Sequence, residues 1–262
     1  MPDKTLDGRV AFVTGGGSGI GEAAARLFAR QGAKVVLISR TKGELEAVVA
    51  DIKAAGGEAS ALEADVSDAE TLKAAIDETV SRYGGLDIVF ANAGVNGTWA
   101  GIEDLTEADF RKTVDINLVG TFLTIKFAVP HLRARGGSVV VTSSVNGTRM
   151  FSNSGASAYA STKAAQVALT KMLALELAPH NIRVNVVCPG AIDTEIDDNT
   201  DQANEGVGVR VEFPDGKVPL TGGKPGSSEQ VAQLVLFLAS DASSHITGTE
   251  MWIDGAQSLL QG

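Results

Sequence analysis

Short apolar runs rich in β-branched residues alternate along this chain with longer alanine-rich stretches of helical period. The runs are almost continuously apolar, which is typical of strands buried on both faces of a sheet. They predict strands at Val10–Thr14, Lys34–Ile38, Leu86–Ala91, Ser138–Thr142 and Ile182–Val187, a weaker strand ending at Asp65, and a last strand at Glu250–Ile253. The alanine-rich stretches predict helices at Ile20–Gln31, Lys42–Ala55, Ala69–Tyr83, Glu107–Leu132 and Ala158–Ala178.

The repeated order of strand and helix predicts an α/β fold, with a doubly wound, Rossmann-like parallel sheet of about seven strands and helices on both faces. The chain has 262 residues and shows no linker, composition shift or internal repeat that would divide it. We therefore expect residues 1–262 to form a single domain.

Segment 193–226 breaks this alternation, because it is rich in Asp, Asn and Gly and longer than an ordinary connection. Inside it, alternating apolar residues precede a Pro-Asp-Gly turn: Val207, Val209, Val211, Phe213 and then Pro214–Gly216. Two interpretations stay open. The segment is either a substrate lid that carries a small β-hairpin or a disordered surface loop.

Composition narrows the classes of partner and compartment. Hydrophobic residues make up 44% and charged residues 21%, as in soluble globular proteins, and no apolar run approaches the roughly eighteen residues of a membrane span. The net charge of −10 disfavours nucleic acid and anionic membranes as main partners. Cys188 is the only cysteine and the N-terminus shows no secretory signal, so we expect a cytoplasmic protein.

A glycine-rich loop follows the first predicted strand and opens the first predicted helix. It reads Thr14-Gly-Gly-Gly-Ser-Gly-Ile-Gly21, with Gly15, Gly19 and Gly21 at G-x-x-x-G-x-G spacing. Glycines let backbone N–H groups approach a ligand closely, and the helix N-terminus adds partial positive charge. The loop, including Ser18 and Ile20, is therefore predicted to bind a pyrophosphate; the alternative is a glycine-rich turn that binds nothing.

The end of the second predicted strand distinguishes between dinucleotides. An acid about twenty residues after the loop would accept the ribose 2′-hydroxyl of NAD, but Ser39 and Arg40 stand there instead. Arg40 could pair with the 2′-phosphate of NADP and Ser39 could add a hydroxyl donor. We therefore predict NADP(H) over NAD(H), which stays possible; the alternative is a solvated Arg40.

Tyr159 and Lys163 lie four residues apart in a predicted helix, so both side chains stand on one helical face. A cation near a phenol favours the phenolate and lowers a pKa that is about 10 when unperturbed. Such a tyrosine can exchange a proton with a substrate oxygen near neutral pH. The histidines His131, His180 and His245 lack metal-site spacing, so we expect no metal.

Three motifs occur in a familiar order: the glycine loop, Asn92-Ala93-Gly94 after the fourth strand, and Tyr159-x-x-x-Lys163. In this order the chain resembles a short-chain dehydrogenase/reductase over nearly its whole length. The resemblance implies a nicotinamide cofactor and the interconversion of alcohols with ketones or aldehydes.

The resemblance also implies roles for further residues in cofactor binding. Asp65 and Val66 resemble the pair that contacts adenine, although Asp65 could also act as an N-cap-like acid. Asn92, Ala93 and Gly94 resemble the turn beside the adenosine ribose; the alternative is a plain turn that holds the sheet together. In Pro189–Thr194, the Ile192 backbone and the Thr194 hydroxyl resemble the groups that hold the nicotinamide carboxamide, and a rigid Pro-Gly strand exit is the alternative.

Two more catalytic residues follow from the resemblance. Asparagine is unfavourable inside a helix, and Asn117 stands inside a predicted one. In the family an Asn at this place interrupts the helix, and its main chain holds a water that relays protons. The alternative is an amide that is hydrogen-bonded in the core. Ser143 and Ser144 end the fifth strand, and by its place before Val-x-Gly we choose Ser144 to bind the substrate oxygen. The gap from Ser144 to Tyr159 is longer than is usual in the family, which predicts a bulge within Met150–Ser157.

The sequence thus predicts an NADP(H)-dependent carbonyl reductase or alcohol dehydrogenase acting on a small molecule. A non-catalytic NADP(H)-binding sensor and a dehydratase or epimerase are the alternatives. Two interpretations stay open for a set of mostly apolar positions. They either line a pocket for an apolar substrate or belong to the core or an interface: Trp99, Met150, Phe151 and the segment 193–226. The resemblance implies a homotetramer, with interfaces at Glu107–Leu132 and Ala158–Ala178 and at Trp252–Gly262.

Overall fold

A computed structural model describes residues 4–194, 196, 200–202, 207–208 and 218–261. Its centre is a seven-stranded parallel sheet in the order β11-β7-β6-β4-β1-β2-β3, which confirms the doubly wound fold. The strands are β1 (Val10–Thr14), β2 (Lys34–Ser39), β3 (Glu58–Glu63), β4 (Ile88–Ala91), β6 (Gly137–Thr142), β7 (Ile182–Pro189) and β11 (Glu250–Ile253). The weaker strand therefore ends at Glu63, two residues before the predicted end at Asp65.

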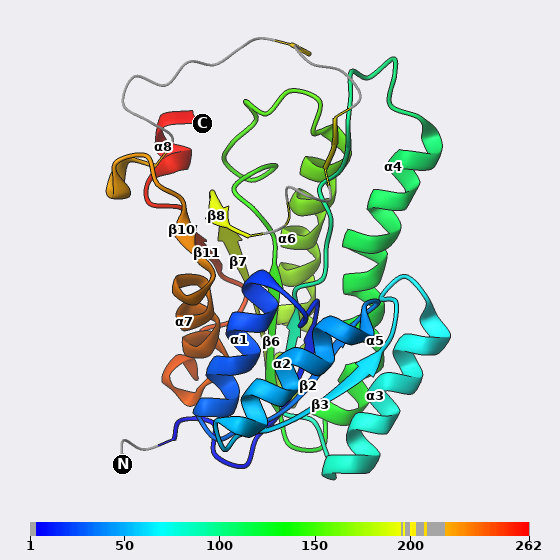
Figure 1. Ribbon diagram of the computed structural model, residues 1–262, viewed down its shortest axis with the longest axis vertical. Helices are drawn as coiled ribbons and strands as arrows, with labels where there is room; N and C mark the ends of the chain where they lie inside the picture. Colours follow the sequence, from blue (N-terminus) through cyan, green and yellow to red (C-terminus); the bar gives the residue numbers. More distant parts are fainter. Residues whose placement is uncertain (1–3, 195, 197–199, 203–206, 209–217, 262) are drawn as a thin grey trace.

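Helices cover both faces of this sheet (Figure 1). One face carries α1 (Gly19–Arg30), α2 (Lys42–Ala54) and α7 (Ser228–Ala239), and the other carries α3 (Ala69–Tyr83), α5 (Gly120–Leu132) and α6 (Ser157–Leu177). Ala11 and Val13 of β1 pack in the first core, whereas Val10 and Phe12 pack in the second. This alternation explains why the strands are apolar on both faces.

None of the predicted helices covers α7, although the sequence carries a signal for it. Ser227 is the N-cap, and it forms a capping box with Gln230, whose side chain accepts from the Ser227 backbone N–H. A serine followed three residues later by glutamine and an apolar run is typical of a helix start. The helix packs against α1 and completes the first core. A short α8 (Gln257–Gln261) follows β11.

The predicted helix Glu107–Leu132 contains a π-turn. It consists of α4 (Glu107–Val114), η1 (Asp115–Val119) and α5, with Asn117 fully buried at the centre of the π-turn. Gly120 follows the π-turn at a close approach, since a Cβ there would lie 2.8 Å from a methyl of Val66. Among the described residues this is the single helix long and apolar enough to cross a bilayer, but it lies against α3 and the sheet as a core helix.

A tight turn after β6 fixes the start of α6. Gly147 has φ of +79°, and a Cβ at this position would overlap the carbonyl oxygen of Ala160. The backbone of the turn therefore lies directly on the first turn of α6, which carries Tyr159 and Lys163. This contact places α6 relative to the end of β6.

Short strands join segment 193–226 to the rest of the chain. β8 (Ile192–Asp193) pairs with β10 (Gly226–Ser227), and β9 (Thr200–Gln202) pairs with β5 (Gly97–Trp99), both in parallel. The predicted hairpin falls mainly on residues 209–217, which lie outside the described residues, so it stays a prediction.

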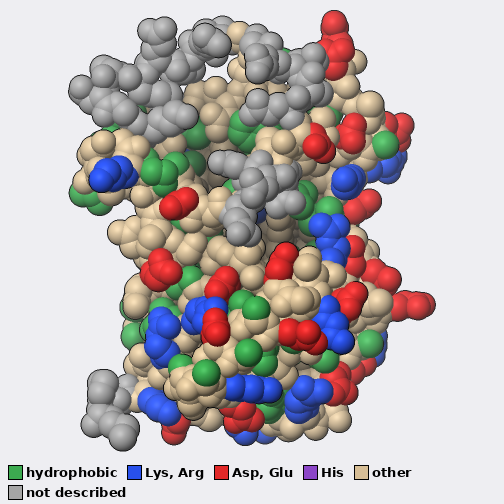
Figure 2. Space-filling view, viewed as in Figure 1, with side chains coloured by type: hydrophobic (Ala, Val, Ile, Leu, Met, Phe, Trp, Pro, Cys, Tyr) green, Lys and Arg blue, Asp and Glu red, His purple; other side chains and the backbone are tan. Residues whose placement is uncertain are grey.

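On the face shown in Figure 2, Lys and Arg side chains stand among Asp and Glu side chains.

Candidate active site

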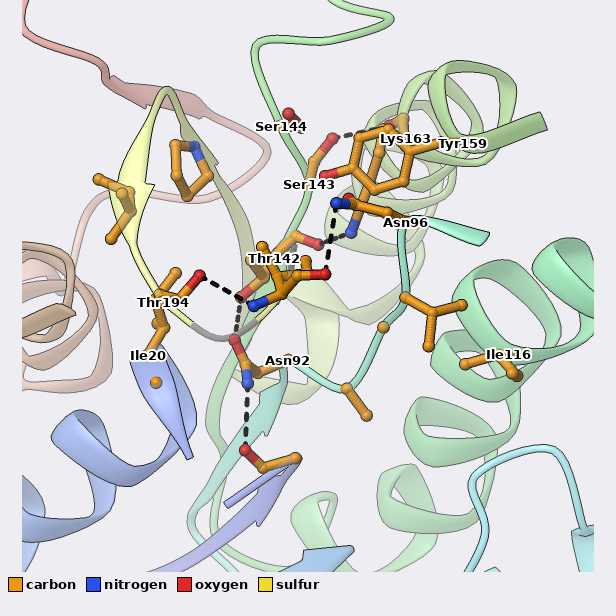
Figure 3. Close-up of a pocket in the computed structure, with 18 of the residues that line it drawn as sticks. Ile20, Asn92, Asn96, Ile116, Thr142, Ser143, Ser144, Tyr159, Lys163 and Thr194 are labelled. Atoms are coloured by element: carbon orange, nitrogen blue, oxygen red, sulfur yellow. Dashed lines mark hydrogen bonds between the residues drawn. The ribbon is translucent and has the colours of Figure 1, made fainter. Parts of the chain in front are cut away.

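A cavity of about 650 Å³ lies where the carboxyl ends of the parallel strands meet (Figure 3). Its size suits a small-molecule or cofactor site, and the position is the one where open α/β sheets bind ligands. Its lining contains these predicted site residues: Gly15, Ser18, Gly19, Ile20, Ser39, Arg40, Asp65, Val66, Asn92, Ala93, Gly94, Ser144, Tyr159, Lys163, Ile192 and Thr194. Gly21 and Asn117 lie behind this lining. The fold thus brings together residues from nearly the whole chain.

The glycine loop forms the floor of one end of the cavity. Gly15 and Gly19 have φ of +65° and +52°, and a Cβ at Gly21 would overlap the carbonyl oxygen of Gly15. α1 begins at Gly19, and the side chain of its N-cap residue Ser18 makes no capping hydrogen bond. The first N–H groups of α1 therefore stand at the cavity without a side-chain cap, which fits a pyrophosphate.

Three side chains define the cavity beyond the end of β2. Arg40 is exposed, and Ser39 Oγ accepts a hydrogen bond from the Thr41 N–H at 3.1 Å. Glu44 also lines the cavity, and its carboxylate would lie 2.9 Å from a Cβ placed on Gly17. The first turn of α2 thus adds an acid to a lining that also contains Arg40.

Asp65 follows β3 and forms a local turn. Its Oδ1 accepts hydrogen bonds from the Ser67 N–H at 2.8 Å and the Ser67 hydroxyl at 2.7 Å. Burial acts to raise the pKa of this carboxyl, but the Ser67 hydrogen bonds and the Arg40 charge outweigh it and hold the pKa below its usual value. The N-cap of α3 is Asp68, whose carboxylate accepts from the Glu70 and Thr71 N–H groups.

The Asn92 turn links the ends of three strands. The Thr14 hydroxyl accepts hydrogen bonds from the Asn92 and Ala93 N–H groups at 2.9 and 3.0 Å. Asn92 Oδ1 accepts from the Thr142 hydroxyl at 3.0 Å. The turn therefore holds β1, β4 and β6 together, and it also lines the cavity.

Lys163 is 3% exposed and lies beside Tyr159, which is 7% exposed. Its Nζ donates a hydrogen bond to the Thr142 carbonyl oxygen at 2.9 Å and lies 5.4 Å from the centroid of the Tyr159 ring. Burial lowers the pKa of Lys163 to about 8. The structure thus confirms the predicted approach of the two side chains on one face of α6, with the ammonium largely charged at neutral pH.

The two serines at the end of β6 differ in their partners. The Ser143 hydroxyl donates to the Lys163 carbonyl oxygen at 2.7 Å and so ties β6 to α6. Ser144 Oγ accepts from the Asn146 N–H at 3.1 Å, which leaves its own proton to donate into the cavity. This difference supports the choice of Ser144.

Asn117 anchors the π-turn through both its amide and its carbonyl. The amide exchanges hydrogen bonds with the Val95 backbone, each 2.9 Å long, and donates to the Thr162 hydroxyl. Its main-chain carbonyl accepts from the Thr121 hydroxyl at 2.7 Å and from Gln166 Nε2 at 2.8 Å. The core-bonded amide is thus present, and the role of the carbonyl in holding a relay water stays a prediction.

The segment after β7 closes the cavity above the glycine loop. Gln257 Oε1 accepts from the Ala191 N–H at 2.6 Å, and the Thr194 side chain lies over Gly19. Asn96 donates to the Thr200 hydroxyl at 2.8 Å and to the Ile196 carbonyl, and so connects this segment to the strand-end loop after β4. The Ile192 and Thr194 side of the site is therefore held from two directions.

Comparisons with known proteins agree with this geometry. A family model described as enoyl-(acyl carrier protein) reductase matches residues 15–256. A 3-oxoacyl-[acyl-carrier-protein] reductase of Thermotoga maritima is 36% identical over 95% of this chain and 98% of its own length. A cyclohexanol dehydrogenase of an Acinetobacter species is 37% identical over 96% and 95%. The chain belongs to the short-chain dehydrogenase/reductase family.

Solved structures of this family match the fold over its length. A 3-ketoacyl-ACP reductase of Sinorhizobium meliloti is 51% identical, with a TM-score of 0.91 over 96% of this chain and 99% of its own. A short-chain dehydrogenase of Burkholderia cenocepacia, solved in complex with NADP, is 34% identical, with a TM-score of 0.83 over 96% and 98%. The predicted family resemblance is confirmed, and it carries nicotinamide-cofactor binding with it.

The structure adds site residues that the sequence analysis did not name. Glu44, Asn96, Asn146, Asn153 and Gln257 all line the cavity. Glu44 had a usable signal, because it stands on the first turn of a helix that begins just after Arg40. Asn153 and Gln257 had none, since only the tertiary fold brings them to the cavity. Of the residues with two open interpretations, Trp99 and Met150 line the cavity, whereas Phe151 is 74% exposed and is not part of the described lining.

Burial of Lys163 predicts a distinctive pH dependence of stability in this short-chain dehydrogenase/reductase without cofactor. In the unfolded chain the lysine keeps its proton up to pH about 10.5, whereas the folded protein releases it above pH about 8. The destabilisation caused by the buried charge is thus constant below pH 8. It fades as the pH rises from 8 to 10.5, where the unfolded state binds more protons.

We expect Lys163→Met to lose its stability advantage over wild type in that window, by an amount on the order of 3 kcal/mol. Denaturant unfolding at several pH values measures the difference. Lys53→Met, at an exposed position on α2, is the control and should show no such trend. A difference between Lys163→Met and wild type that stays constant from pH 8 to 10.5 would contradict the burial of a charged lysine.

Proposed function

We propose that this protein is an NADP(H)-dependent oxidoreductase that interconverts a ketone or aldehyde with the corresponding alcohol, with Tyr159 as general acid/base. The observation that carries the proposal is the buried Lys163 ammonium beside Tyr159, at a cavity whose other end is the glycine loop. NADP(H), when bound, supplies or accepts the hydride, and the protein supplies position and electrostatics. The glycine loop, Arg40, Asp65, Asn92, Ile192 and Thr194 are the groups that would hold it.

The protein's own part of the reaction concerns the substrate oxygen. In reduction, the Ser144 hydroxyl donates a hydrogen bond to the carbonyl oxygen and stabilises the developing alkoxide. The Tyr159 hydroxyl gives its proton to that oxygen. The Lys163 ammonium stabilises the phenolate left behind, because opposite charges attract strongly where water is excluded. Oxidation of the alcohol runs the same steps in reverse.

We propose that the main chain of Asn117 takes part in the supply of protons to Lys163. Asn117 lies in the π-turn, and its side-chain amide donates to the hydroxyl of Thr162. Thr162 is the residue directly before Lys163. We keep the family-derived role of the Asn117 main chain in holding a relay water. Thr121 and Gln166 already donate to this carbonyl, so a water would have to share it with them.

Tyr159→Phe tests the chemistry directly. Loss of the general acid should lower kcat by at least about 100-fold while the affinity for NADPH changes little. The readout is NADPH consumption against a panel of ketones and aldehydes, together with the dissociation constant of NADPH. Tyr83→Phe is the matched control, because Tyr83 is the other tyrosine and its hydroxyl bonds Ser60, outside the cavity.

The outcome of that panel also separates the alternatives. Binding of NADPH without turnover of any carbonyl compound or alcohol would favour a sensor. Substrate conversion without net change in cofactor would favour a dehydratase or epimerase. High residual activity in Tyr159→Phe would exclude Tyr159 as the acid.

We propose a preference for NADP(H) that rests on the balance between Arg40 and Glu44. The Arg40 guanidinium suits a 2′-phosphate, whereas the Glu44 carboxylate near Gly17 opposes a second negative charge and could instead accept a ribose hydroxyl. The NADP complex of the Burkholderia cenocepacia relative supports the cofactor class. The preference of this chain is an expectation from these two side chains.

Arg40→Asp should lower the ratio of kcat/KM for NADPH over NADH by about ten-fold or more, because it replaces a charge-assisted contact with a repulsion. Glu44→Gln should shift the ratio in the opposite direction. Glu46→Gln, which removes a carboxylate from the same helix where it pairs with Lys42, is the control. Equal efficiency with both cofactors that Arg40→Asp leaves unchanged would refute the preference.

We further propose a cytoplasmic homotetramer that acts on a small carbonyl or alcohol. Four apolar side chains on the helices of the predicted interface are 40 to 79% exposed: Phe110, Phe122, Met172 and Leu175. Burial of such a patch against another copy would remove apolar surface from water. Trp99 and Met150 in the cavity support a partly apolar substrate.

The double variant Met172→Glu/Leu175→Glu should lower the assembly mass in light scattering, because it places charges in the proposed interface. Ile102→Glu, at an 80% exposed position outside these helices, is the control and should not change the mass. A wild-type monomer at micromolar concentration would rule out the tetramer. Cell fractionation tests the compartment.

A further inference from the structure

The wall of the cavity next to Ser144 is built by the segment from Val145 to Ala156, and its backbone is held at several points. The Met150 N–H donates to the Val145 carbonyl at 2.9 Å, and the Gly147 N–H donates to the Met150 carbonyl at 3.1 Å. At the far end the Gly155 carbonyl accepts from the Ala100 N–H at 3.1 Å. The long segment between Ser144 and Tyr159 thus forms an ordered wall of the cavity.

Two asparagines of this wall form an amide pair. Asn153 Nδ2 donates to Asn146 Oδ1 at 3.2 Å, and both residues line the cavity and are half-buried. The two remaining side-chain groups of the pair, Asn146 Nδ2 and Asn153 Oδ1, have no hydrogen-bond partner among the described residues. Turning both amides over exchanges the two groups, so the pair offers one donor and one acceptor in either orientation.

The pair stands close to the reacting atoms. The Asn146 N–H donates to Ser144 Oγ at 3.1 Å, so the asparagine that carries one amide also orients the hydroxyl proposed to bind the substrate oxygen. Met150, whose backbone is bridged to Asn146, also lines the cavity, as does Trp99. A polar group on the substrate near its reacting carbon would therefore meet the two amides.

We infer that Asn146 and Asn153 form a subsite for a hydroxyl group carried by the substrate near its reacting carbon. A hydroxyl both donates and accepts, which matches the two unpaired amide groups, whereas a carboxylate only accepts and an ammonium only donates. The charged side chains in the described lining are Arg40, Glu44, Asp65 and Lys163, and the first three lie at the strand ends assigned to the adenosine half. The inference rests on the proposed function and narrows its substrate to a neutral diol or hydroxyketone.

Three alcohols with one ring test the subsite with the wild-type holoenzyme. Cyclohexane-1,2-diol (cis and trans), 2-methoxycyclohexanol and cyclohexanol differ only in the group beside the reacting alcohol. The methoxy group has an inductive effect similar to that of a hydroxyl group, but it cannot donate a hydrogen bond. The kcat/KM with NADP⁺ should be about ten-fold higher for the better diol isomer than for the methoxy compound, as expected for a lost hydrogen bond and an unpaired amide.

Substitution of either amide should remove this preference. Asn153→Ala, and separately Asn146→Ala, which keeps the backbone N–H toward Ser144, should bring the diol-to-methoxy ratio down to about one. Ser154→Ala, an exposed residue of the same wall outside the described lining, should keep the wild-type ratio. An unchanged ratio in both asparagine variants overturns the subsite.

Binding measurements separate this inference from the proposed reaction. Dissociation constants of the same alcohols for Tyr159→Phe loaded with NADP⁺ report the subsite without turnover. If the diol binds more tightly than the other alcohols and Asn153→Ala abolishes this difference, the subsite is supported. This holds even where wild-type enzyme oxidises none of the alcohols and the proposed reaction fails. Equal or absent binding of all three alcohols overturns it.

Discussion

The hydrogen bond from Lys163 Nζ to the Thr142 carbonyl is the interaction on which the site depends. It holds an ammonium in a place where water is almost excluded, and such a charge is tolerated only with a fixed partner. The carbonyl that accepts it belongs to the last residue of β6. Through the Lys163 side chain, α6 is thereby joined to the end of β6 in the central sheet.

The position of that carbonyl depends in turn on the neighbouring strands. The Thr142 hydroxyl donates to Asn92, and the backbone of the Asn92 turn donates to the Thr14 hydroxyl. Ser143 adds a bond to the backbone of Lys163 itself. These contacts run from β1 through β4 and β6 to α6, so the glycine loop at one end of the cavity and the Tyr159–Lys163 pair at the other share one rigid support.

The substrate side of the cavity is built differently from the cofactor side. The proposed cofactor side uses strand ends, the start of α1 and the segment after β7, whereas the proposed substrate side uses the 145–156 wall and Trp99 of β5. A wall of this kind can change in length and side chains without disturbing the parallel sheet. Relatives named as a 3-oxoacyl-[acyl-carrier-protein] reductase and a cyclohexanol dehydrogenase match this chain over nearly its whole length, as expected for a fold that supports more than one substrate.

The sequence alone determined the order of strands and helices, the glycine loop and the spacing of Tyr159 and Lys163, because these features follow from local periodicity and from residues close in the chain. It left α7 unrecognised, although Ser227 and Gln230 carried its capping signal. Only the tertiary structure decided that Ser143 bonds the backbone of α6 while Ser144 faces the cavity, and that Asn153 donates to Asn146 near Ser144. Those outcomes depend on which hydrogen-bond partners meet once distant segments pack, and no pattern along the chain encodes that choice.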